Sequence, residues 1–123
     1  MTVTGPDFIA LQVRDLESAA TFYETQLGLT RAPASPPGAV VFTTTPIAFA
    51  VREPLPGVDP TRISPRPGAG VALWMHAENV QQLHDSLAAS GSPILRGPEP
   101  GPFGLMVTFA DPDGYEVTIH EQA

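Results

Sequence analysis

The sequence LMVTFADPDGYEVTIHE, from Leu105 to Glu121, contains two apolar runs separated by four turn-forming residues. Asp111 can accept hydrogen bonds from backbone N–H groups further along the turn, and Pro112 fixes its own φ. Gly114 can adopt the positive φ that closes such a turn. The stretch therefore predicts a β-hairpin. The turn residues alone do not distinguish it from an ordinary surface hairpin without a functional role.

Upstream of this hairpin the chain has two similar segments, each a strand followed by a helix. In the first, apolar residues alternate over Phe8–Val13, Asp15 is a suitable helix N-cap, and Gly28 ends the helical spacing. A shift of 64 residues places Asn79 over Asp15 as a second N-cap, and Gly91 ends the second helical segment. The chain therefore predicts two copies of one unit.

The domain organisation follows from this repeat. The last expected strand, Tyr115–Glu121, matches Ile47–Glu53 at an offset of 68 residues. Between the units, residues 54–70 carry five prolines and no periodicity, which is typical of a connecting loop or flap. We therefore expect a single domain made of two βαβββ modules, residues 1–53 and 71–123, joined by a Pro-rich loop at 54–70.

Composition excludes several classes of function. The 123 residues are 42% hydrophobic, and no apolar run reaches the ~18 residues of a membrane span. With no signal peptide either, we expect a cytoplasmic protein without a membrane partner. The absence of cysteine excludes disulfides, thiolate metal sites and cysteine nucleophiles. A net charge of −7, with six scattered arginines and no lysine, argues against a nucleic-acid partner.

Four motifs together resemble the vicinal oxygen chelate superfamily, home of glyoxalases, bleomycin-resistance proteins and extradiol dioxygenases. They are strand–Asp–Leu–Glu, Phe22-Tyr23, Leu27-Gly28-Leu29 and DPDGYE. The resemblance covers nearly the whole chain. It implies an α+β fold in which paired βαβββ modules form a U-shaped mixed-sheet cleft with the helices on the convex side.

The resemblance also locates the positions where enzymes of this superfamily hold a divalent metal. Those positions are Phe8, Ala50, Ala72 and Thr118. Phenylalanine and alanine cannot coordinate a metal, and one neutral hydroxyl cannot hold a divalent ion alone. We therefore expect no metal and no cofactor. A relocated site made of His76, His120 and Glu116 stays open as an alternative.

A cleft floor without metal ligands suits a large, flat, hydrophobic ligand. Trp74 supplies a ring face on which an aromatic ligand can stack, although an ordinary core position is the alternative. For Arg52 the alternative is a surface cation paired with Glu53 or Glu121. No catalytic residue is predicted. The predicted ligand-binding residues are Phe8, Gln12, Phe42, Arg52, Trp74, His76, Phe103, Thr118 and His120.

This pattern resembles the antibiotic-binding branch of the superfamily, the bleomycin-resistance-like proteins. They sequester a drug without altering it, as homodimers with clefts at the subunit interface. The resemblance implies resistance by sequestration of an aromatic natural product, such as a fused polycyclic compound or a cationic intercalator.

Two other functions stay open. One is an enzyme, either a lyase, isomerase or dioxygenase with relocated metal ligands or a metal-free acid/base catalyst using His76, His120 or Glu116. The other is an interaction protein whose cleft holds a peptide or the 54–70 loop.

Overall fold

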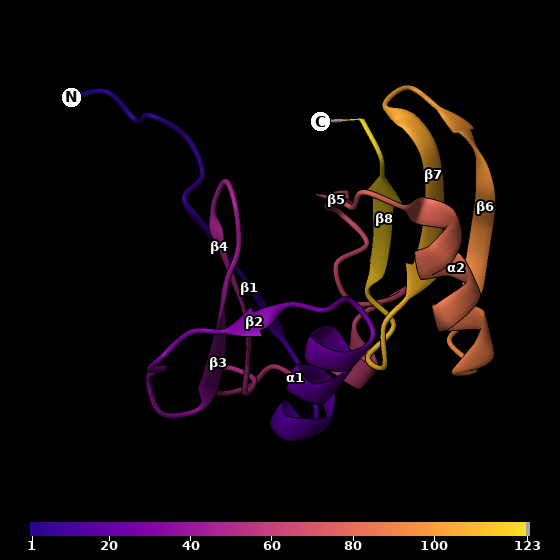
Figure 1. The fold of residues 1–123 in the computed structure, drawn as a ribbon. Helices are drawn as coiled ribbons and strands as arrows, with labels where there is room; N and C mark the ends of the chain where they lie inside the picture. The colour runs from indigo at the N-terminus through magenta and orange to yellow at the C-terminus, as the bar shows by residue number, and fades with distance from the viewer. Residues whose placement is uncertain (123) are drawn as a thin grey trace. The chain divides into compact units, whose positions relative to one another are not determined.

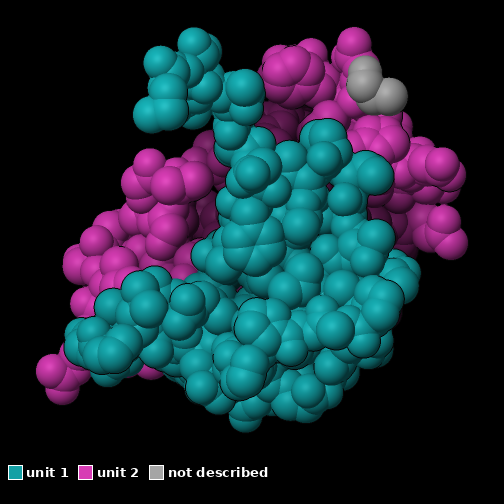
Figure 2. All heavy atoms as spheres, turned by 90° about the vertical axis from the view of Figure 1, so that its left-hand side faces the viewer, with its two compact units in different colours: residues 1–60 teal, residues 61–123 magenta. Residues whose placement is uncertain are grey.

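The computed structural model describes residues 1–122, which form eight strands and two α-helices. The chain divides into two compact units, Met1–Pro60 and Thr61–Ala123, which Figure 2 draws in separate colours. The boundary lies inside the Pro-rich loop, next to a short 3-10 helix at Pro60–Arg62. Each unit has the element order βαβββ, so the predicted α+β class and paired modules are confirmed.

The first unit contains one four-stranded mixed sheet and one helix. Strand β1 is parallel to β4, and the other neighbours, β4 with β3 and β3 with β2, are antiparallel (Figure 1). The elements in chain order are β1 (Phe8–Gln12), α1 (Leu16–Thr25), β2 (Thr30–Arg31), β3 (Ala39–Thr43) and β4 (Ala48–Arg52).

The core of the first unit lies between α1 and its sheet. The helix begins where the side chain of Asp15 accepts a hydrogen bond from the N–H of Ser18, at 3.0 Å. Its buried face presents Tyr23, whose ring centroid lies 6.3 Å from that of Phe42 and 5.0 Å from that of Phe49. These three buried aromatic rings close one face of the first sheet.

The second unit repeats this arrangement. Its sheet has the order β5-β8-β7-β6, with β5 parallel to β8 and the other pairs antiparallel. Helix α2 packs against β6 and β7 (Figure 1). The elements are β5 (Leu73–His76), α2 (Val80–Ala89), β6 (Ile94–Gly101), β7 (Gly104–Ala110) and β8 (Glu116–His120).

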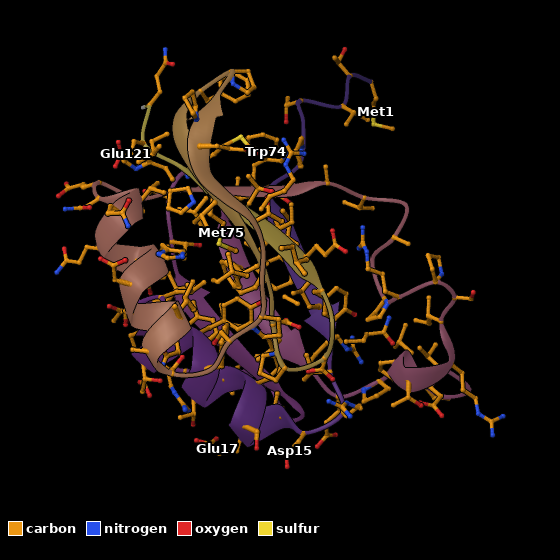
Figure 3. All side chains as sticks on the ribbon, turned by 90° about the vertical axis from the view of Figure 1, so that its right-hand side faces the viewer. Met1, Asp15, Glu17, Trp74, Met75 and Glu121 are labelled. Atoms are coloured by element: carbon orange, nitrogen blue, oxygen red, sulfur yellow. The ribbon has the colours of Figure 1, made fainter. Side chains whose placement is uncertain are left out.

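Helix α2 is fixed at both ends. As predicted, Asn79 caps it by accepting a hydrogen bond from the N–H of Gln82, at 2.9 Å. The carboxylate of Glu121, just after β8, accepts a second one from the N–H of Val80, at 2.8 Å (Figure 3). The helix ends before Gly91, which has a φ of +81°. The last strand of the second sheet therefore positions the start of α2.

The hairpin between β7 and β8 has the geometry that its sequence predicts. Asp111 is 4% exposed, and its Oδ1 accepts hydrogen bonds from the N–H groups of Asp113 and Tyr115, both at 2.9 Å. The backbone N–H of Asp111 donates to the carbonyl oxygen of Tyr115, and Gly114 has a φ of +94°. The turn is therefore organised around one buried carboxylate.

We expect the substitution Asp111→Ala to lower the free energy of unfolding by about 1–3 kcal/mol, because it removes the acceptor of a buried N–H group. Asp111→Asn is the matched control, since its amide oxygen can still accept both hydrogen bonds. Urea unfolding followed by circular dichroism measures both variants. An alanine variant as stable as the asparagine variant would show that the carboxylate does not organise the turn.

None of the helices formed by residues 1–122 combines the length and apolar character that crossing a membrane requires. The packing of both modules around one U-shaped cleft stays a prediction.

Candidate ligand-binding site

The second sheet has one face under α2 and one face that no helix of the second unit covers, which we call the open face. Side chains alternate along β5, so Leu73 and Met75 lie on one face and Trp74 and His76 on the other. Trp74 is 39% exposed, which excludes the alternative that it is an ordinary core residue (labelled with Met75 in Figure 3). The open face therefore presents the only tryptophan of the chain.

Four ring side chains gather on the open face, and we call them the aromatic cluster: Trp74, His76, Phe103 and His120. The indole of Trp74 meets the ring of Phe103 edge to face, at a centroid distance of 5.7 Å and an interplanar angle of 89°. His120 lies 6.1 Å from Trp74, 5.6 Å from Phe103 and 5.9 Å from His76, between ring centroids. All four are among the predicted ligand-binding residues, and their role in binding stays a prediction.

Strand pairing and a turn bring the cluster together. His76 and His120 are partners in the register of the parallel strands β5 and β8. Phe103 lies in the turn between β6 and β7 and is 50% exposed. Nε2 of His76 lies 3.0 Å from the carbonyl oxygen of Glu121, so this nitrogen is the donor of that hydrogen bond. That contact fixes the orientation of one imidazole ring.

A hollow of about 300 Å³ adjoins the cluster on the side of Trp74. Its polar groups are the hydroxyls of Thr108 and Thr118, which hydrogen-bond each other at 2.7 Å, and an ion pair in which Nε of Arg66 lies 2.7 Å from a carboxylate oxygen of Glu116. The residues that line the hollow are Arg66, Ala69, Gly70, Val71, Ala72, Leu73, Trp74, Thr108, Glu116 and Thr118.

One wall of the hollow is the end of the Pro-rich loop. This segment packs closely on the β7–β8 hairpin. Gly68 lies so near the ring of Tyr115 that a Cβ added to it would be 2.8 Å from a ring carbon. Gly68 has a φ of +74°, and its carbonyl oxygen accepts a hydrogen bond from the N–H of Val71, at 3.0 Å. The loop wall is therefore held against the sheet by packing and by the Arg66–Glu116 pair.

The residues present do not fit the divalent metal that the superfamily's enzymes use. Ala72 and Thr118 both line the hollow, and together they offer one neutral hydroxyl that already pairs with Thr108. The relocated site does not form either, because Glu116 and His120 are at opposite ends of β8, about 13 Å apart at the usual rise per residue. Over residues 1–122, no three His, Asp or Glu side chains are placed to hold one ion.

Four predicted residues belong to the first unit, and one of them is corrected by the structure. Phe42 is 0% exposed and packs against Tyr23 and Phe49 under α1, so its assignment to the ligand-binding surface is wrong. Phe8 is exposed on β1. Its place in a binding surface stays a prediction.

The two polar residues of the first unit have local partners. The side-chain oxygen of Gln12 accepts a hydrogen bond from the N–H of Leu55, at 2.8 Å, so it anchors the start of the Pro-rich loop. Nε of Arg52 donates to the carbonyl oxygen of Glu53, at 3.0 Å. Both side chains therefore hydrogen-bond to backbone groups of their own unit, at Leu55 and Glu53.

Sequence reasoning missed Thr108 and Arg66. Thr108 had a signal, because the hairpin turn at Asp111–Gly114 pairs it with Thr118 across β7 and β8. Arg66 had none, since it lies in a loop without periodicity and meets Glu116 only through tertiary structure.

The sequence profile of the Glyoxalase/Bleomycin resistance protein/Dioxygenase superfamily matches residues 5–119. This chain therefore belongs to that superfamily. None of the functionally curated proteins matches the sequence significantly.

Solved structures share the fold over nearly the whole chain. TnmS3, an antibiotic binding protein from Streptomyces sp. CB03234, is 20% identical, with a TM-score of 0.76 over 100% of this chain and 99% of its own. A glyoxalase-related enzyme from Fulvimarina pelagi is 26% identical, with a TM-score of 0.73 over 95% and 87%. Lactoylglutathione lyase from Agrobacterium tumefaciens is 23% identical, with a TM-score of 0.66 over 97% and 94%. Binding proteins and enzymes thus share this fold, and only the site can separate them.

Proposed function

We propose that this protein binds a flat, hydrophobic, aromatic small molecule on the open face of the second sheet and releases it unchanged. The observation that carries the proposal is the exposed indole of Trp74, set edge to face with the exposed ring of Phe103. Exposed aromatic rings in contact with each other form a surface on which a further ring can stack, worth about 0.5–1.5 kcal/mol beyond the apolar area it buries. A surface of this kind is a binding surface for an aromatic ligand.

The polar groups nearby support binding more than catalysis. A general base must be free to reach a substrate proton. Nε2 of His76 is turned to a backbone carbonyl, and Glu116 is paired with Arg66. The side chains at the superfamily's metal positions supply no ligand set. These contacts engage two of the three candidate acid/base residues, and Nδ1 of the third, His120, is buried. We therefore infer that the open face interacts with a ligand by stacking and hydrogen bonding.

An antibiotic is the ligand class that we propose, because the fold is shared with the antibiotic binding protein TnmS3. Resistance would then follow from mass action. An expressed binder lowers the free drug concentration when its own concentration exceeds both the dissociation constant and the amount of drug.

We propose in addition that the working form is a homodimer, as the bleomycin-resistance-like proteins suggest. Large apolar side chains that are exposed in the single chain, among them Phe8 and Val71, are available for such an interface. Sedimentation velocity gives the mass directly. A protein that stays monomeric at micromolar concentration, with and without ligand, would contradict this assembly.

The functional proposal predicts that planar aromatic compounds quench the fluorescence of Trp74 with saturation. The chain has a single tryptophan, so the signal reports one site. Each compound that binds is then incubated with excess protein, extracted and identified by mass spectrometry.

We expect saturable quenching and quantitative recovery of the unmodified compound. A panel of fused-ring compounds without any saturable quencher would refute binding at Trp74, and conversion of a ligand to product would refute sequestration.

A further inference from the structure

The hollow beside Trp74 differs in chemistry from the aromatic cluster. Its charged groups are paired with each other: Nε of Arg66 lies 2.7 Å from one carboxylate oxygen of Glu116. This contact is made by Nε and one carboxylate oxygen, so the guanidinium has two further nitrogens as donors and the carboxylate a second oxygen as acceptor. The pair has no net charge, so it favours neither an anionic nor a cationic ligand by charge alone.

A ligand group that suits this pair can both accept a hydrogen bond from the guanidinium and donate one to the carboxylate. Hydroxyl groups have that property, because each can accept from Arg66 and donate to Glu116. The hydroxyls of Thr108 and Thr118 extend the same chemistry along the sheet. Their mutual hydrogen bond at 2.7 Å uses one hydroxyl proton and leaves the other for a ligand.

The remaining lining of the hollow is Trp74 together with the small or apolar residues 69–73. An indole side chain packs well against the C–H groups of a saturated ring, while the hydroxyls of that ring reach the polar groups. The volume of about 300 Å³ lies at the small end of the range of ligand pockets, ~300–1,000 Å³, so the hollow accommodates one ring and not a whole polycyclic compound.

We propose that the hollow is a subsite for a neutral, polyhydroxylated ring, such as a sugar, that is attached to the aromatic part of the ligand. The aromatic part stacks on the cluster formed by Trp74 and Phe103, and the attached ring enters the hollow between Arg66, Glu116 and Thr118. The inference rests on the proposed function, because it assigns the second half of a ligand whose first half binds the aromatic cluster. It makes the preferred ligand an aromatic glycoside.

Matched pairs of glycoside and aglycone test this subsite. Methylumbelliferyl glucoside with methylumbelliferone, and esculin with esculetin, differ only in one neutral glucose. Isothermal titration calorimetry gives the ratio of the two affinities within each pair. We expect the glucoside to bind about 10-fold more tightly than its aglycone, the equivalent of one or two well-placed hydrogen bonds.

Two substitutions assign the preference to the hollow. Thr118→Val removes a hydroxyl at nearly constant volume, and Arg66→Gln removes the guanidinium. Each is expected to bring the affinity ratio close to one. Gln82→Ala, at an exposed side chain of α2 and outside the hollow, is expected to leave the ratio unchanged.

The outcomes separate the two proposals. Equal or weaker binding of the glucosides, with aglycones that still bind, overturns the subsite and leaves the aromatic site intact. A glucoside preference that survives both substitutions also overturns the assignment to the hollow. If neither the aglycones nor the glucosides bind, the proposed function fails as well.

Discussion

Replacing Trp74 by alanine is expected to lower the affinity for an aromatic ligand by about 10- to 100-fold. The indole supplies both the exposed stacking face and the edge-to-face contact with Phe103. Truncation of a central aromatic anchor commonly costs about 2 kcal/mol or more, and each 1.4 kcal/mol is about a factor of ten. Because the variant has no tryptophan, isothermal titration calorimetry measures the affinity.

The control is Gln82→Ala, an exposed side chain on α2 of the same unit, away from the open face. Its affinity is expected to equal that of the parent protein. Unfolding free energies of the two variants are expected to differ little, since both side chains are exposed. A Trp74→Ala protein that binds as tightly as the control would mean that the ligand lies elsewhere.

Phe42→Ala, by contrast, is expected to change stability and not affinity. We expect it to lower the free energy of unfolding by about 3–5 kcal/mol. Phe42 is fully buried, and its ring centroid lies 6.1 Å from that of Phe49. Truncation leaves a cavity between α1 and the first sheet. Thermal and urea unfolding measure the loss.

Phe42→Leu preserves more of the packing and keeps the experiment interpretable if the alanine variant does not fold. Its affinity for the ligand is expected to match that of the parent protein. A leucine variant with parental stability and impaired binding would restore Phe42 to the ligand-binding surface and contradict its place in the core.

The features that the sequence predicted well are encoded locally. Asp111 and Gly114 form their turn through hydrogen bonds and a backbone conformation within five residues. Asp15 and Asn79 cap their helices through contacts three residues away. Such signals depend on neighbouring residues alone, so pattern and residue chemistry are enough to locate them.

The face of β3 could not be predicted in the same way. The strand has the sequence AVVFT from Ala39 to Thr43, and apolar residues stand on both of its faces. Without alternation, only the pairing partner decides which side chains are buried. Phe42 pairs with Phe49, and this register turns it toward α1.

Tertiary contacts made by single side chains could not be predicted from the sequence either. Strand β2 has only two residues, and it is held to α1 by Arg31, whose guanidinium lies 2.8 Å from a carboxylate oxygen of Glu17. The hydrogen bond from Arg31 lowers the pKa of Glu17. In the second unit, Arg66 reaches Glu116 from a loop without periodicity, and both residues line the hollow.

The central claim is that an aromatic ligand stacks on Trp74, and the indole N–H signal of this residue tests it most directly. A ¹H–¹⁵N spectrum contains one such signal, because the chain has one tryptophan. During titration with a fused-ring ligand, we predict that this signal shifts and saturates together with the backbone signals of His76 and His120. A ligand that binds with saturation while the indole signal stays in place would contradict the claim.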